Sequence, residues 1–191
     1  REAGLGDIHI YDSIGEMCNK VDVMCNFTTN DARVSTTREI ADAVEKGADL
    51  KGIIFEKPLA RNVAESNQIV KLAVGTGVPT AYFENQIFMP SVVNSRHQLQ
   101  AIEKAMGPAH LSRTAEEHAG PPLGGWFWSP ERQGGGVWSD MGCHSVAVGM
   151  DMVTPMNKIP DYMEPISINA TLSLLKWGNK PWIDKLKDAG I

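Results

Sequence analysis

The stretch Ile53-Ile54-Phe55-Glu56-Lys57-Pro58 places the strongest constraint on the fold of this chain. An apolar run leads directly into a charged pair, and a proline closes the segment. A short apolar run that ends in turn residues is typical of a buried strand in a parallel sheet. Ligands of open α/β sheets bind outside the carboxyl ends of such strands, so Glu56 and Lys57 are expected at the mouth of a site. A strand that ends in a surface ion pair is about equally compatible with this stretch alone.

The segments around this strand alternate between strand and helix patterns. Strands are predicted at 21–27, 52–55 and 78–83, and helices at 14–19, 32–46 and 62–74. Asn62 and Glu65 have the spacing of a capping box at the start of the last of these helices, and Gly47 lies where the preceding one should end. This order predicts βαβ units in a parallel sheet.

The pattern of the sequence changes near residue 90. A helix is predicted over 91–106, followed by a strand-like segment at 109–114, a loop rich in glycine and proline at 120–136, a helix after Gly136 and a long strand at 166–177. We therefore predict an α/β chain with a partial Rossmann-type parallel sheet over residues 1–89. An α+β domain with an open, mainly antiparallel sheet is expected over residues 90–191, for substrate binding and oligomerisation.

Composition excludes several classes of protein. A net charge of −5 without a basic run makes a nucleic-acid partner unexpected. No apolar stretch approaches the ~20 residues that span a bilayer, so no membrane partner is expected. Cys18, Cys25 and Cys143 form no CxxC pair, which favours free thiols in a reducing, cytoplasmic compartment. A signal sequence upstream of Arg1 would change that location.

Asp140 and His144 are four residues apart in the predicted helix after the glycines. This spacing places both side chains on one helix face, where a carboxylate can orient an imidazole and stabilise its charged form. The glycines at 134–136 allow the backbone to approach another group closely. A helix-surface ion pair, or a histidine satisfied by a backbone carbonyl, is the commoner explanation of an isolated pair of this kind.

The Glu-Lys-Pro turn and the stretch GGGVWSDMGCH, about 80 residues later, together resemble the Gfo/Idh/MocA family of NAD(P)-dependent oxidoreductases. The resemblance runs from about Gly15 to Trp177. It implies NAD or NADP as cofactor and oxidation or reduction of a hydroxyl or carbonyl group on a sugar, cyclitol or related polyol. It also implies a homo-oligomer of the full-length protein, and no metal ion is expected in the site.

The resemblance also implies roles for individual residues. Lys57 matches the lysine that contacts the substrate hydroxyl and the nicotinamide region, and Asp140 and His144 match the substrate-binding carboxylate and the catalytic histidine. The positions expected beside the cofactor are Thr28, Thr29, Asn30, Glu56, Lys57, Asn85 and Gln86.

The sequence departs from the family pattern at several positions. Thr29 replaces a proline, Arg33 replaces a histidine, and Ala147 replaces an acidic residue that commonly follows the catalytic histidine. The family's first strand, glycine-rich turn and second strand have no counterpart before Val21, where only about 20 residues precede the first predicted strand. The chain is therefore expected to be an internal part of a longer enzyme and not to be active by itself.

Two other functions stay open at this point. A non-catalytic relative that binds a nucleotide as a sensor or scaffold is one, although the retained Lys57, Asp140 and His144 argue against it. A metal-dependent hydrolase is the other. Trp126, Phe127 and Trp128 suit the apolar face of a sugar, but plain packing or an oligomer contact is the commoner use of such residues. Cys143 is not expected to be a nucleophile, because no dedicated base is evident for it.

Overall fold

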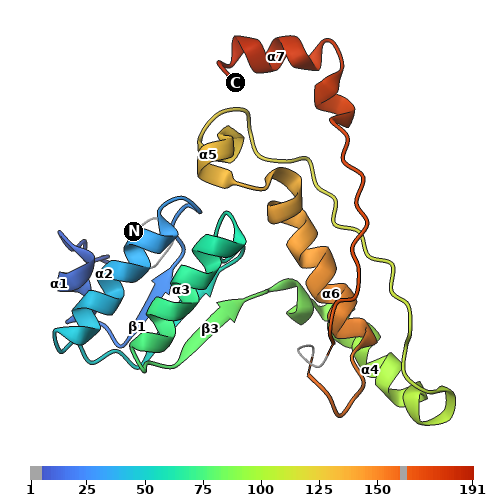
Figure 1. Ribbon diagram of the computed structural model, residues 1–191, viewed down its shortest axis with the longest axis horizontal. Coiled ribbons are helices and arrows are strands. Elements are labelled where there is room, and N and C mark those ends of the chain that lie inside the picture. Colours follow the sequence, from blue (N-terminus) through green and yellow to red (C-terminus); the bar gives the residue numbers. More distant parts are fainter. Residues whose placement is uncertain (1–5, 160–162) are drawn as a thin grey trace. The chain divides into compact units, whose positions relative to one another are not determined.

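The computed structural model describes residues 6–159 and 163–191, and the chain divides into two compact units after Phe83 (Figure 1). The first unit contains α1 (Ile14–Cys18), β1 (Val23–Asn26), α2 (Arg33–Glu45), β2 (Gly52–Glu56), α3 (Val63–Gly75) and β3 (Thr80–Phe83). The second contains η1 (Gln86–Phe88), α4 (Pro90–Met106), η2 (Trp126–Trp128), α5 (Pro130–Gln133), η3 (Trp138–Gly142), α6 (Cys143–Val153), η5 (Leu175–Gly178) and α7 (Trp182–Asp188). The predicted boundary after residue 89 lies between η1 and α4, whereas η1 packs against α6 and so groups with the second unit.

The first unit is built on a parallel sheet with the order β1-β2-β3. This confirms the predicted succession of strands and helices. β2 is the middle strand, and its Ile53 and Phe55 lie beside Met24 and Asn26 of β1 in the register. Paired residues share a face of the sheet, and all four are buried.

Helices α2 and α3 pack against each other on this face (Figure 1). Ile40 and Ala43 of α2 and Ile69 and Ala73 of α3 belong to the same buried core as Ile53. Their spacing of three and four residues keeps each pair on one side of its helix. Burial of a side chain such as Ile53 contributes about 1.5–3 kcal/mol to stability, so this core holds the sheet edge in place.

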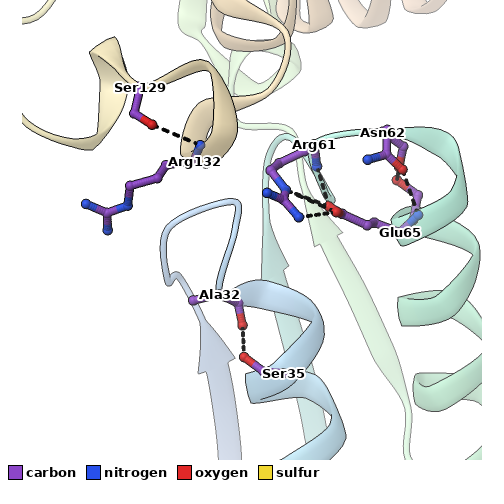
Figure 2. A network of polar contacts seen from close by, with 8 residues as sticks. Ala32, Ser35, Arg61, Asn62, Glu65, Ser129 and Arg132 are labelled. Carbon is purple, nitrogen blue, oxygen red and sulfur yellow. Dashed lines mark hydrogen bonds and ion pairs between the residues drawn. The ribbon is translucent and has the colours of Figure 1, made fainter.

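The start of α3 is defined by its cap, as the sequence predicts (Figure 2). Asn62 accepts a hydrogen bond of 3.0 Å from the backbone N–H of Glu65. The Glu65 carboxylate accepts hydrogen bonds of 3.0 and 3.1 Å from Arg61 Nε, and these lower the pKa of Glu65 below its ordinary value. The folded state therefore gains stability from this contact at neutral pH, and loses it as the pH falls through the folded-state pKa.

The second unit centres on α6, which packs against α4 and η1. Arg96 of α4 reaches across to α6, where its Nε lies 3.9 Å from Asp151 Oδ2. Ser129 caps the short helix α5 by accepting a hydrogen bond of 3.3 Å from the backbone N–H of Arg132 (Figure 2). Among the described residues, no helix combines the length and the apolar character that a membrane span requires.

The two strands predicted for the second unit, at 109–114 and 166–177, are not found. Residues 109–114 run beside α6, where Thr114 Oγ1 donates a hydrogen bond of 2.8 Å to the Ser145 carbonyl. The second segment ends in the 3-10 helix η5, and its Ile166 and Ile168 side chains are 98% and 83% exposed. A strand requires a hydrogen-bonded neighbour, and within the described ranges neither segment has one. No antiparallel sheet is therefore present there.

The cap of α3 leads to a stability prediction. We expect Asn62→Ala to lower the free energy of unfolding by about 1 kcal/mol, because the Glu65 N–H loses its acceptor. Asn62→Asp keeps an acceptor at the same position and should lie close to the unchanged protein. Urea denaturation of the three proteins measures both effects. Equal losses for the two substitutions would show that the cap has no such role.

Candidate functional site

A buried arginine ties together the loops that follow β1 and β2. Arg33, the first residue of α2, is only 2% exposed. Its guanidinium donates hydrogen bonds to the carbonyls of Thr28 at 2.6 Å and Glu56 at 2.9 Å, and also to that of Pro58. Thr28 lies just beyond β1, and Glu56 and Pro58 lie at the end of β2. One side chain therefore holds both strand-end loops at the same edge of the sheet.

The environment of Arg33 explains why this position needs a guanidinium. Burial lowers its pKa from the ordinary value, while the nearby Glu56 carboxylate and Tyr82 raise it. A planar group with several donors can serve carbonyls in different directions, which an ammonium group does less well. Arg33 Nε has no hydrogen-bond partner although it is buried. Lys57 lies between Glu56 and Pro58, whose carbonyls accept from Arg33, so its backbone is part of the loop that Arg33 holds.

A second polar network supports the loop after β1. The buried Asn26 side chain donates to Thr37 Oγ1 at 3.0 Å and to the Arg33 carbonyl at 3.3 Å. Its carbonyl oxygen accepts from Thr28 Oγ1 at 2.8 Å and from Thr36 Oγ1 at 3.1 Å. The network joins the end of β1 to the first turns of α2. These contacts fix the direction in which the Thr28 backbone leaves the strand.

The cofactor positions predicted for the first unit lie on these two loops. Thr28, Thr29, Glu56 and Lys57 are partly buried, and Asn30 is buried. Glu56 Oε1 accepts the backbone N–H of Lys57 at 2.8 Å, and the Lys57–Pro58 peptide bond is cis. Hydroxyl, amide and carboxylate groups at the carboxyl end of a parallel sheet suit the ribose and amide groups of a dinucleotide. The residues present therefore fit NAD or NADP at this edge.

The second unit contains a buried histidine–carboxylate pair. His144 Nδ1 lies 2.6 Å from Glu84 Oε1, and the two side chains are only 8% and 9% exposed. The same carboxylate oxygen accepts the backbone N–H of Gln86 at 3.0 Å. An ionised carboxylate only accepts hydrogen bonds, so this pairing places the imidazole proton on Nδ1 and leaves Nε2 as the basic nitrogen. The predicted catalytic histidine thus has a buried carboxylate partner, Glu84, which lies just before η1 in the chain.

The helix that carries His144 begins with a π-helical turn, η3, which runs directly into α6. Gln133 holds the glycine-rich turn before it, because its side-chain amide donates to the Gly136 carbonyl at 3.0 Å and to Ser139 Oγ at 2.9 Å. Gly136 has a φ of +57°, a conformation that glycine adopts without strain. π-helical turns within helices are frequent at functional sites.

Asp140 lies in this π-helical turn beside a second histidine. Asp140 Oδ2 is 3.7 Å from His118 Nε2, and His118 Nδ1 accepts the Gly120 N–H at 2.8 Å. Both side chains line a cavity of about 200 Å³ whose aromatic lining comes from Phe127, Trp128 and Trp177. A carboxylate and an imidazole on an aromatic-lined cavity provide hydrogen-bonding groups beside apolar ring faces.

The remaining predicted positions, Asn85 and Gln86, lie at the start of η1 in the second unit. Asn85 is exposed, and Gln86 Nε2 donates to Glu116 Oε1 at 3.1 Å. The sequence did not identify Glu84, His118, Gln133 or Arg33 as part of a site. Glu84 carried a signal, because it directly follows a predicted strand. Gln133 carried none beyond its place in the glycine-rich loop, and His118, just before that loop, carried none.

The chain is similar to several proteins of known sequence or structure. It is 28% identical over 156 residues to the uncharacterized protein YMR315W of Saccharomyces cerevisiae, covering 79% of this chain and 42% of that protein. The crystal structure of GenD2 from gentamicin A biosynthesis, in complex with NAD, matches with a TM-score of 0.63 and 25% identity over 75% of this chain and 40% of GenD2. No protein-family model matches the sequence.

A further solved structure supports the fold alone. The aldose-aldose oxidoreductase from Caulobacter crescentus, complexed with glycerol, has a TM-score of 0.60 at 20% identity, over 75% of this chain and 41% of that enzyme. The chain spans about two fifths of the length of these relatives. The matched part of the chain thus resembles NAD-binding oxidoreductases, and the parallel sheet is consistent with their Rossmann-like fold.

The Arg33 contacts predict a large effect on stability. We expect Arg33→Met to lower the free energy of unfolding by about 3 kcal/mol, because it leaves several backbone carbonyls without their donor. Arg38→Met, an exposed position on the same helix, is the matched control and should change stability by no more than about 0.5 kcal/mol. Thermal and urea denaturation measure both. Similar small effects for the two variants would contradict the role given to Arg33.

Proposed function

We propose that this chain is part of an NAD(P)-dependent oxidoreductase of the Gfo/Idh/MocA family that acts on a hydroxyl or carbonyl group of a sugar, cyclitol or related polyol. The observation that carries the proposal is the buried contact of 2.6 Å between His144 Nδ1 and Glu84. It gives the histidine of the sequence motif the environment that a general base requires. The likeness to GenD2, crystallised with NAD, supports the same class of reaction.

His144 is proposed to move the proton of the reacting hydroxyl. Its Nδ1–H donates to Glu84, so Nε2 carries the lone pair that accepts a proton from substrate during oxidation. Glu84 then stabilises the imidazolium that forms. Glu84 also supplies the acidic partner that the family pattern led us to expect near His144, where the chain has Ala147.

Lys57 is proposed to contact the same reacting oxygen. It follows the carboxyl end of β2, on the loop that Arg33 holds through the Glu56 and Pro58 carbonyls. An ammonium group beside a hydroxyl stabilises the negative charge that develops on oxygen when its proton leaves.

Asp140 and His118 are proposed to bind the other hydroxyl groups of the substrate. Both line the aromatic cavity of about 200 Å³. A carboxylate accepts hydrogen bonds from hydroxyl groups, and aromatic faces pack against the C–H faces of a sugar ring. Trp128 is held in place through its Nε1–H, which donates to the Pro122 carbonyl at 2.8 Å. This assignment gives the cavity a role in substrate choice.

NAD or NADP, when bound, supplies the acceptor or donor of the hydride. The residues proposed to hold it in the first unit are those of the two strand-end loops, Thr28, Thr29, Asn30, Glu56 and Lys57. Asn85 and Gln86 are proposed to face the nicotinamide of the cofactor. The chain's own contribution to the chemistry is orientation and proton transfer.

The first kinetic prediction concerns Lys57, Asp140 and His144 in the complete protein. Lys57→Met and His144→Ala should each reduce kcat by about 10²- to 10⁴-fold, because general acid–base groups act mainly in the transition state. Asp140→Ala should mainly raise KM, because its proposed role is to hold substrate hydroxyls. The measurement is kcat and KM with one polyol found by screening with NAD and NADP.

Dinucleotide affinity provides the control for these variants. The Kd for NAD(P) should change little in His144→Ala, because this residue is not assigned to the cofactor. Near-normal kcat in both Lys57→Met and His144→Ala would overturn the proposed site.

A second kinetic prediction separates charge from geometry at Glu84. Glu84→Ala should reduce kcat nearly as much as His144→Ala, because Nδ1 loses its acceptor and the imidazole is no longer held in one tautomer. Glu84→Gln keeps an acceptor oxygen and should recover part of kcat, with KM unchanged in both variants. A loss confined to KM, or to stability, would show that Glu84 does not act through His144.

A further inference from the structure

Glu84, Cys143 and His144 bring one potential metal-binding atom each into a small volume of the second unit. The carboxylate oxygen, the thiol sulfur and the imidazole nitrogen all lie within 4.8 Å of one another. Within the described ranges this is the one group of three or more histidine, cysteine or acidic side chains with such spacing. Glu84 and His144 are buried and Cys143 is partly buried, so the group is not a chance gathering of solvated surface carboxylates.

We propose that these three side chains form a binding site for a zinc-type divalent ion, and that the bound ion switches off His144 as a base. The binding part of the proposal stands on the geometry of the cluster. The inhibitory part rests on the function proposed above. The ion is a regulator of the site and takes no part in the reaction.

The types of ligand select the class of ion. Nitrogen, thiolate sulfur and carboxylate oxygen are the ligands of protein-bound Zn²⁺, and three protein ligands leave a fourth position open for water. Mg²⁺ and Ca²⁺ prefer sites made entirely of oxygen, so they should not bind here. Co²⁺ is expected to bind in place of Zn²⁺, because the same nitrogen and sulfur ligands accept it.

In the structure, a proton shared between His144 and Glu84 occupies the position that the ion would take. His144 Nδ1 and Glu84 Oε1 are 2.6 Å apart, whereas two such ligands of one tetrahedral zinc ion are separated by about 3.4 Å. A side-chain movement of less than about 1 Å therefore converts the hydrogen-bonded pair into two ligands. As the ion binds, the Cys143 thiol proton leaves to solvent, and the proton on His144 Nδ1 is exchanged through solvent for one on Nε2, so the imidazole stays neutral.

Neighbouring contacts hold two of the ligands near their positions. Glu84 Oε1 accepts the Gln86 N–H at 3.0 Å, which restricts rotation of the carboxylate. The Cys143 thiol lies 3.2 Å from the Ser139 carbonyl and 3.6 Å from that of Asp140, within the turn that begins α6. The Gln86 N–H can still donate to the carboxylate when an ion is bound and so orients that ligand, whereas the Cys143 thiol gives up its contacts with the two carbonyls when it loses its proton.

Coordination at Nδ1 has a direct consequence for the histidine. A neutral imidazole carries one proton, and a metal on Nδ1 leaves that proton on Nε2. The nitrogen that accepts a proton from substrate in the proposed reaction is then already protonated. Zinc binding therefore replaces the productive tautomer of His144 by the unproductive one, and removes the Glu84 contact that stabilises its charged form.

Isothermal titration of the metal-free protein with zinc chloride tests the site without any assay of activity. We expect about one ion per chain, with weaker binding at pH 6 than at pH 8 because protons compete for the ligands. Cys143→Ser and Glu84→Gln should each weaken binding by about tenfold or more. Cys25→Ser and His97→Ala, which change an exposed cysteine and an exposed histidine elsewhere, are the matched controls and should bind as the unchanged protein does.

Cobalt gives an independent readout of the ligand set. Co²⁺ bound to the unchanged protein should show a thiolate-to-metal charge-transfer band, and Cys143→Ser should lose that band while circular dichroism shows it folded. Absence of saturable binding near one ion per chain, or equal affinity in Cys143→Ser, overturns the site. Saturable binding in an active protein whose kcat is unaffected by zinc overturns the inhibitory part. Failure of the proposed function itself is seen separately, in the metal-free kinetics.

Discussion

The buried guanidinium of Arg33 is the interaction on which the strand-end loops of the first unit depend. It joins the loop after β1 to the loop after β2 through the carbonyls of Thr28, Glu56 and Pro58. Parallel strands deliver their carboxyl ends to one edge of a sheet, but they do not determine where the loops beyond that edge go. The buried Arg33 guanidinium supplies that constraint, because it cannot donate to water instead. Leaving the guanidinium or its carbonyl acceptors without hydrogen bonds would cost more free energy than the loops would gain in conformational entropy.

The second unit relies on a similar principle with a different group. The short contact between Glu84 and His144 assigns one imidazole nitrogen to a buried partner and thereby defines what the other nitrogen can do. The same arrangement makes the pair sensitive to whatever occupies the space between its two atoms. In the proposed reaction a proton there leaves Nε2 free to act as a base, whereas a metal ion there would remove that base. The proposed catalytic use and the proposed inhibition are thus two consequences of one geometry.

Particular elements show how far local pattern reaches. The apolar run at 53–55 became the central strand as predicted, because Ile53 and Phe55 find buried neighbours in Met24 and Asn26 of β1 and share a core with α2 and α3. The segment from Ile166 to Leu174 alternates apolar and polar residues, a pattern typical of a strand, yet it forms no strand, and Leu172 is 87% exposed. Alternating apolar residues give a strand one face that can be buried. Burial also requires a neighbouring element that packs on that face, and the local pattern does not specify one.

The sequence by itself determined the parallel sheet of the first unit and the cap of α3, because each depends on residues close together in the chain. The choice of Lys57, Asp140 and His144 as candidates came from two motifs about 80 residues apart that together resemble a known family. Only the tertiary structure decided that His144 pairs with Glu84, which lies 60 positions away, and that Asp140 lies beside His118. The physical reason is that a buried polar group takes whichever partner packing brings within reach. The local sequence can identify a candidate side chain, but it cannot identify the distant side chain that pairs with it.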